Sequence, residues 1–71
     1  MMLTVYKYQG IVDKLTLDIE SGLYGSGDKL PSMAELRKDF GASYGSIRSA
    51  ILILKTRGLV EGRHGVGVFV R

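Results

Sequence analysis

Small and hydrogen-bonding side chains gather where a helix is predicted to begin, shortly after Gly41. Ser43 can accept a hydrogen bond from an amide of the first turn, which fixes the start of this helix. Its outward side carries Tyr44, Gly45, Arg48 and Ser49. Side chains of these types let a helix approach the major groove of double-stranded DNA closely and donate hydrogen bonds to base edges. The chemistry predicted for this stretch is therefore recognition of DNA.

The other side of the same helix is apolar and predicts how the helix is held. Four residues repeat at positions i, i+3, i+4 and i+7, namely Ile47, Ala50, Ile51 and Leu54. This spacing predicts one face packed on a core. Leu52 and Ile53 fall outside that stripe, about 140° and 240° around the helix from Ile47, where polar residues would be expected. One of them could be covered by the N-terminal helix of the chain, or the two could contact a partner or a second copy.

A shorter helix is predicted over residues 33–40, just before the helix that begins at Ser43. Ser32 and Glu35 have the spacing of a capping box, in which each side chain bonds to the other residue's backbone N–H. Leu36 and Phe40 are four residues apart and therefore share a face. Gly41 supplies a stop with positive φ. Two short helices joined by the three residues 41–43 match the helix-turn-helix description.

The remaining segments complete one small domain. A helix from about Val5 to Ile19 is predicted by apolar residues at helical spacing, with Asp13, Lys14 and Asp18 on its solvent side, and Gly22 ends it. A glycine-rich turn and a very short strand at 29–30 follow. After Gly58, strands at 59–61 and 66–70 flank a hairpin at 62–65. The sequence predicts an α+β, mostly helical fold over residues 1–71, a winged helix-turn-helix with three helices and a small β-hairpin wing.

The charge is unevenly placed along the chain. The net charge is +3, but residues 31–71 hold seven Lys and Arg against three Asp and Glu, whereas residues 1–30 sum to −1. A polyanion is the natural partner of such a basic half. The alternative is a solvated surface with a slight excess of cations.

Composition argues against catalysis and metal binding. The 71 residues include no cysteine and one histidine, and their acidic residues are not clustered. The sequence therefore offers no nucleophile–base pair and no metal-ligand set, and we predict no catalytic residues, no metal and no cofactor. Apolar runs such as 50–54 are far shorter than the ~20 residues that span a bilayer, and no signal-peptide pattern follows Met1. A cytoplasmic protein without membrane association is expected.

Motifs spread over most of the chain also resemble a known family. They are Ile19-Glu20-Ser21-Gly22, Gly27-Asp28-Lys29-Leu30-Pro31-Ser32, Glu35-Leu36, Gly41-Ala42-Ser43, Ile47-Arg48-Ser49-Ala50-Ile51, Gly58-Leu59-Val60-Glu61 and Gly65-Val66-Gly67-Val68-Phe69-Val70. With these motifs the chain resembles the N-terminal DNA-binding domain of GntR-family transcriptional regulators. The resemblance implies an operator DNA partner and repression rather than activation. It implies operator contacts at Ser32, Ser43, Ser46, Arg48, His64 and Gly65.

The wing is expected to contribute through its tip. His64 alone would be an exposed loop histidine without a role. Flanked by Arg63 and Gly65 in a wing, it can donate to a phosphate or a minor-groove acceptor.

The chain departs from the resembled family at three positions. Ala34, Tyr44 and Val66 stand where the family commonly has arginine. The operator is therefore not expected to be the family's usual one. The Tyr44 ring could lie along a phosphate or a thymine methyl, or cover the edge of the core; the sequence leaves these alternatives open.

The resemblance also bears on assembly. The family's larger C-terminal effector-binding and dimerising domain is absent from this chain, so we expect an excised domain or a small stand-alone regulator. With no obvious dimerisation element, a homodimer is expected only on DNA, with Leu52 and Ile53 as its candidate protein contacts. The alternative function is a winged-helix protein-interaction module that uses the same pair and binds DNA weakly or not at all.

Overall fold

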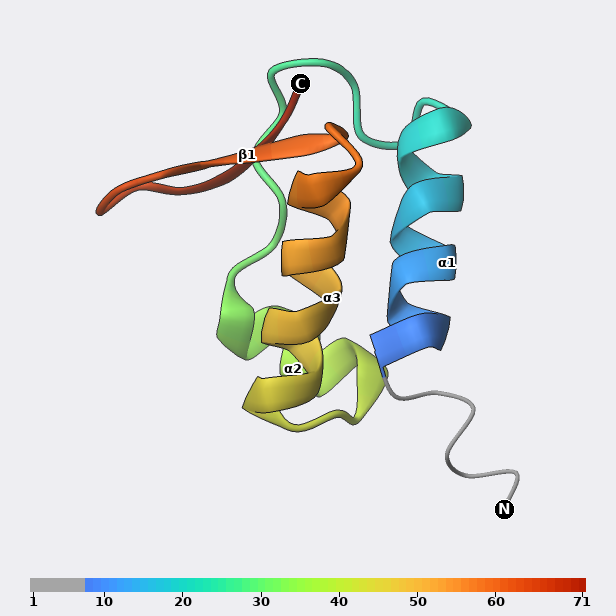
Figure 1. Ribbon diagram of the computed structural model, residues 1–71, viewed down its shortest axis with the longest axis vertical. Helices are drawn as coiled ribbons and strands as arrows, with labels where there is room; N and C mark the ends of the chain where they lie inside the picture. Colours follow the sequence, from blue (N-terminus) through green and yellow to red (C-terminus); the bar gives the residue numbers. More distant parts are fainter. Residues whose placement is uncertain (1–7) are drawn as a thin grey trace.

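Three helices and a two-stranded antiparallel hairpin make up the fold (Figure 1). The computed structural model describes residues 8–71. The elements are α1 (Tyr8–Glu20), α2 (Met33–Phe40), α3 (Tyr44–Thr56), β1 (Val60–Arg63) and β2 (Gly67–Val70). The predicted fold class is confirmed. The start of the first predicted helix, Val5–Lys7, lies outside the described residues.

Helix α1 presents its apolar stripe to the core and ends one residue later than predicted. Ile11, Val12 and Leu15 are buried. Asp18, which the helical pattern placed on the solvent side, is only 8% exposed. The turn after the helix folds back over Asp18, since the Tyr24 N–H donates to the backbone carbonyl of Asp18. Lys14 Nζ lies 2.6 Å from the Asp18 carboxylate. A buried carboxylate is thus paired, as burial of a charge requires.

The capping box forms and determines the bounds of α2, which match the prediction. Ser32 Oγ accepts from the Glu35 N–H at 3.1 Å, and Glu35 Oε1 accepts from the Ser32 N–H at 2.9 Å. Gly41 ends the helix with φ 59°, a conformation that costs a residue with a side chain about 1–2 kcal/mol. Leu36 is buried, and Phe40 is half-buried against the same core.

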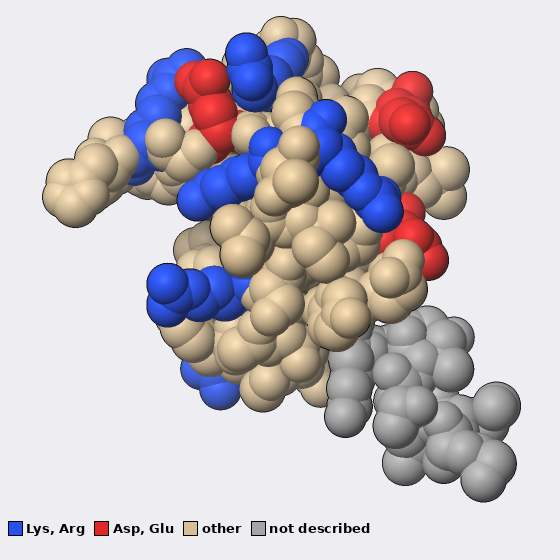
Figure 2. Space-filling model, in the orientation of Figure 1, with Lys and Arg blue, Asp and Glu red and all other residues tan. Residues whose placement is uncertain are grey.

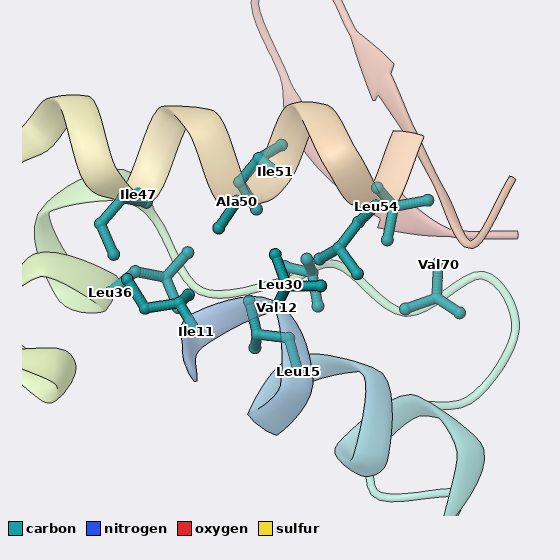
Figure 3. Packing of buried hydrophobic residues seen from close by; sticks show 11 residues of the cluster. Ile11, Val12, Leu15, Leu30, Leu36, Ile47, Ala50, Ile51, Leu54 and Val70 are labelled. Carbon is teal, nitrogen blue, oxygen red and sulfur yellow. The ribbon is translucent and has the colours of Figure 1, made fainter. Parts of the chain in front are cut away.

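Helix α3 lies at the centre of the molecule, beside α1, α2 and the hairpin (Figure 1). Its four predicted core residues are all buried. Figure 3 shows Ile47 and Leu54 projecting from α3 to the same side, toward side chains of α1 and of the segment before α2. The core cluster is Ile11, Val12, Leu15, Leu30, Leu36, Ile47, Ala50, Ile51, Leu54, Val60 and Val70. It contains residues of all five elements and of the segment that leads into α2.

The hairpin is longer at its tip than the sequence predicted. The strands pair from Val60 with Val70 to Arg63 with Gly67, so the loop comprises residues 64–66 rather than 62–65. The reason is that Gly62 and Arg63 find partners across the ladder, and the Val66 N–H closes the turn on the Arg63 carbonyl at 3.0 Å.

The predicted short strand at 29–30 is a single bridge between Lys29 and Phe69. The Leu30 N–H donates to the Val68 carbonyl at 2.8 Å, so this segment covers the outer edge of β2. The wing is therefore tied to the start of α2. In the described part of the chain, no helix has the length and apolar character needed to cross a bilayer.

The capping box makes the stability of the fold sensitive to acid. Hydrogen bonds from Ser32, the backbone N–H first and the side chain second, lower the pKa of Glu35. Because the folded pKa lies below the unfolded value of about 4.3, the contribution is fully present above that pH and is lost as the pH falls through the lowered pKa. Glu35→Gln should therefore reduce the loss of thermal stability between about pH 5 and pH 3, measured by circular dichroism. An unchanged acid profile in the variant would contradict this origin.

Candidate nucleic-acid interface

The start of α3 is fixed by two serine hydroxyls. Ser43 is the N-cap, and its Oγ accepts from the Ser46 N–H at 3.2 Å. The same hydroxyl donates to Ser46 Oγ at 3.1 Å. Ser43 is exposed and Ser46 is half-buried, so both lie at the surface where the helix begins. The cap rigidly positions the residues that follow.

The predicted recognition face of α3 is open to solvent. Tyr44 is 51% exposed, and Gly45, Arg48 and Ser49 are all in the exposed class. Tyr44 and Arg48 line a hollow of about 290 Å³ on this face. The other residues that line it are Met33, Ile51, Leu52, Lys55 and Val68.

The predicted exposed pair of Leu52 and Ile53 is not a pair in the structure. Leu52 is 62% exposed, whereas Ile53 is half-buried and packs against the core. Of the alternatives that the sequence left open, the structure therefore shows one member of the pair, Ile53, covered by its neighbours and the other, Leu52, exposed. The physical reason is that α3 is surrounded by α1, α2 and the hairpin, so its buried surface is wider than the four-residue stripe. Leu52 instead shares a face with Arg48 and Tyr44.

Ser32 lies near the wing, although it is 34 positions from Val66 in the sequence. Both line a second hollow, of about 180 Å³, together with Lys29. Ser32 Oγ accepts its capping bond from the Glu35 N–H, and the residue is exposed. The structure thus brings the start of α2 and the wing onto one surface.

Arg63 is held on the hairpin by its neighbours. Its Nη2 lies 3.1 Å from Glu61 Oε2, and its guanidinium carbon lies 4.2 Å from the centre of the Phe69 ring. His64 and Gly65 are exposed at the tip. The tip therefore offers one free imidazole and backbone groups, with the guanidinium set back along β1.

Two lysines lie along the hairpin on opposite faces. A Cβ built on Gly62 would lie 2.9 Å from Lys55 Nζ, and one built on Gly67 would lie 2.6 Å from Lys29 Cε. Gly62 and Gly67 occupy adjacent pairs of the ladder, whose side chains point to opposite faces. The sequence analysis did not include Lys29 in the site. Gly67, the glycine that leaves room for its side chain, was the feature that could have indicated it.

Lys55 joins the recognition face of α3 to one face of the wing. Lys55 lines both the hollow beside Arg48 and a third hollow along the wing that His64 and Gly65 also line. In Figure 2 basic and uncharged side chains lie beneath the projecting wing, and acidic side chains are seen on the wing itself and at the opposite edge. Within residues 8–71, no three His, Cys, Asp or Glu side chains lie together in a way that could hold a metal ion. The arrangement is suited to a polyanion.

Residues 7–70 match the family model for bacterial regulatory proteins of the gntR family. The chain belongs to the GntR family. One relative is the Uxu operon regulator of Haemophilus influenzae, 41% identical over 63 residues that cover 89% of this chain and 24% of that protein. Another is the histidine utilization repressor of Klebsiella aerogenes, 36% identical over 63 residues, covering 89% and 26%. The chain thus spans about a quarter of the length of these GntR-family relatives.

Solved structures agree with the assignment. The DNA-binding domain of AraR in complex with operator ORX1 superimposes with a TM-score of 0.88 at 33% identity, covering 90% of this chain and 77% of that chain. The fold is the winged helix-turn-helix of GntR-family DNA-binding domains. The family and the fold expected from the sequence motifs are both confirmed.

The wing conformation of this GntR-family chain depends on Gly67. Its φ of 148° costs a residue with a side chain of the order of 1–3 kcal/mol. Gly67→Ala should therefore lower the melting temperature, by about 4–8 °C for each kcal/mol in a domain of this size. Gly62→Ala is the matched control, because Gly62 has no positive φ and its new methyl would meet only the flexible end of Lys55. Equal losses in the two variants, measured by thermal denaturation, would contradict this account.

Proposed function

We propose that this chain binds double-stranded DNA in a sequence-specific manner and acts in transcriptional regulation. The first turns of α3 enter the major groove, and the wing lies at the adjacent minor groove or backbone. The observation that carries this proposal is the exposed donor face of α3, which is capped at Ser43 and fixed from behind by four buried side chains. The likeness to a domain solved on its operator supports it.

Each surface group has a distinct role in this proposal. Arg48 reads a base edge, since a guanidinium can bond to a guanine with two parallel hydrogen bonds. Tyr44, Gly45, Ser46 and Ser49 allow close approach or contact the backbone. Lys29, Lys55 and the wing residues Arg63, His64 and Gly65 contact phosphates or the minor groove, and Ser32 adds a contact beside the wing.

The regulatory direction and assembly follow from the relatives and from the geometry of DNA. We propose repression, by similarity to the histidine utilization repressor. Two copies are proposed to pair on DNA when half-sites lie ~34–36 Å apart on one face of the duplex. We assign no catalysis and no effector binding to residues 8–71, and we place the protein in the cytoplasm, where its DNA would be.

Binding should be strongly dependent on salt. If the basic groups of this surface make ~4 phosphate contacts, log K should fall with log salt at a slope of about −3 to −4. Fluorescence anisotropy with a labelled duplex across a salt series measures this slope. Absence of binding even at low salt would overturn the proposal and favour a winged-helix module that binds protein through exposed Leu52.

Arg48 should determine selectivity rather than affinity alone. Arg48→Ala should cost about 1–3 kcal/mol on the preferred site and relax selectivity at one base position. Arg48→Lys is the matched control, because it keeps the charge but loses the planar fork, so selectivity should still relax while binding to random DNA is retained. Selection of bound sequences from a random duplex pool, followed by competition binding, measures both. Uniform weakening on all sequences would reassign Arg48 to the phosphate backbone.

A further inference from the structure

The hollow beside Arg48 combines an apolar wall with a basic rim. Leu52 is 62% exposed there, and the partly buried Met33 and Val68 lie next to it. Arg48 and Lys55, both on α3, line the same hollow as these apolar groups. None of the residues that line the hollow is acidic. Such an arrangement can take an apolar group that belongs to a polyanion.

Leu52 lies on the same helical face as the proposed recognition residues. Tyr44, Arg48 and Leu52 are spaced at i, i+4 and i+8, and all three line this hollow. From Tyr44 to Leu52 the helix rises about 12 Å, a length of about three to four base pairs at ~3.4 Å each. A helix that lies along the groove can therefore bring Leu52 to the bases as well.

The chemistry of base edges selects one occupant. In the major groove, adenine, guanine and cytosine present hydrogen-bond donors and acceptors, whereas thymine adds a 5-methyl group. An aliphatic wall cannot satisfy a donor or acceptor, and leaving one unpaired costs free energy. The methyl group of thymine loses nothing on leaving water and gains from burial.

A second copy of the chain fits this hollow less well than DNA does. If two copies met at this hollow, Arg48 and Lys55 of one copy would face the same cations of the other. This repulsion between like charges is unfavourable. Ile53, the other member of the predicted contact pair, packs into the core and does not extend the apolar surface.

We propose that Leu52, with Met33 and Val68, forms a site for the 5-methyl group of a thymine in the major groove, next to the base read by Arg48. This inference rests on the proposed function, because it names one base that the DNA-binding face reads. It makes Leu52 a specificity-determining residue and not a protein contact.

Replacing thymine with uracil tests the site, because uracil lacks only the methyl group and keeps every hydrogen-bonding atom. The preferred duplex is first selected from a random pool with the unmodified chain. Each thymine of a half-site is then replaced singly by uracil, and the dissociation constants are compared. We expect one position at which the methyl group is worth about fourfold in affinity, the value of one buried CH₂ group.

The variant Leu52→Ala should bind the thymine and uracil duplexes equally at that position. Leu17→Ala is the matched control, since Leu17 is 60% exposed but lies on α1, away from this hollow. It should keep the full preference for thymine. Circular dichroism of both variants confirms that they fold, as expected for substitutions of exposed residues.

The outcomes separate the two proposals. Salt-dependent DNA binding with no uracil-sensitive position overturns the methyl site and leaves the proposed function standing. A Leu52→Ala variant that keeps its uracil sensitivity, but loses cooperative filling of two half-sites, assigns Leu52 to a protein contact and also overturns it. Absence of any DNA binding overturns the proposed function itself.

Discussion

The packing of α3 against the rest of the molecule is the interaction on which the structure depends. Ile47, Ala50, Ile51 and Leu54 are fully or nearly fully buried, and they contact a cluster that draws residues from every other element. A chain of 71 residues buries only about 60% of its unfolded surface, and residues 8–71 contain no second core to replace this one. The same packing leaves the opposite side of α3 free, so the element that stabilises the fold also presents the candidate recognition face.

The wing depends on that core less directly. Val60 and Val70 anchor its base, but its outer edge is covered by the segment before α2 through the hydrogen bond from Leu30 to Val68. This pairing protects an edge strand that would otherwise expose unpaired backbone groups. It also explains how Ser32, at the start of α2, comes to lie near the tip of a hairpin far along the sequence.

The basic groups of the surface are positioned by backbone features as much as by their own contacts. Lys29 and Lys55 run along the hairpin where glycines leave room for them. Arg63, in contrast, is held by Glu61 and Phe69 and is less free to reorient. A phosphate that competes for Arg63 must replace an existing ion pair, whereas the two lysines have no acidic partner within salt-bridge distance in the described part of the chain.

The sequence by itself determined the features that depend on local interactions. The bounds of α2, its capping box, the stop at Gly41 and the buried stripe of α3 all arise from residues within a few positions of one another. The exposed face from Tyr44 to Ser49 followed from the same helical period, and motifs over most of the chain indicated the family.

Only the tertiary structure decided the features that depend on distant segments. Periodicity placed Asp18 and Ile53 outside the core, but the turn after α1 folds over Asp18, and the neighbours of α3 cover Ile53. The wing loop shortened because ladder partners across the hairpin were available to Gly62 and Arg63. The place of Lys29 on the wing and of Leu52 beside Arg48 likewise required knowledge of which surfaces meet. A helical period states which residues share a face, but burial depends on what the rest of the chain brings against that face.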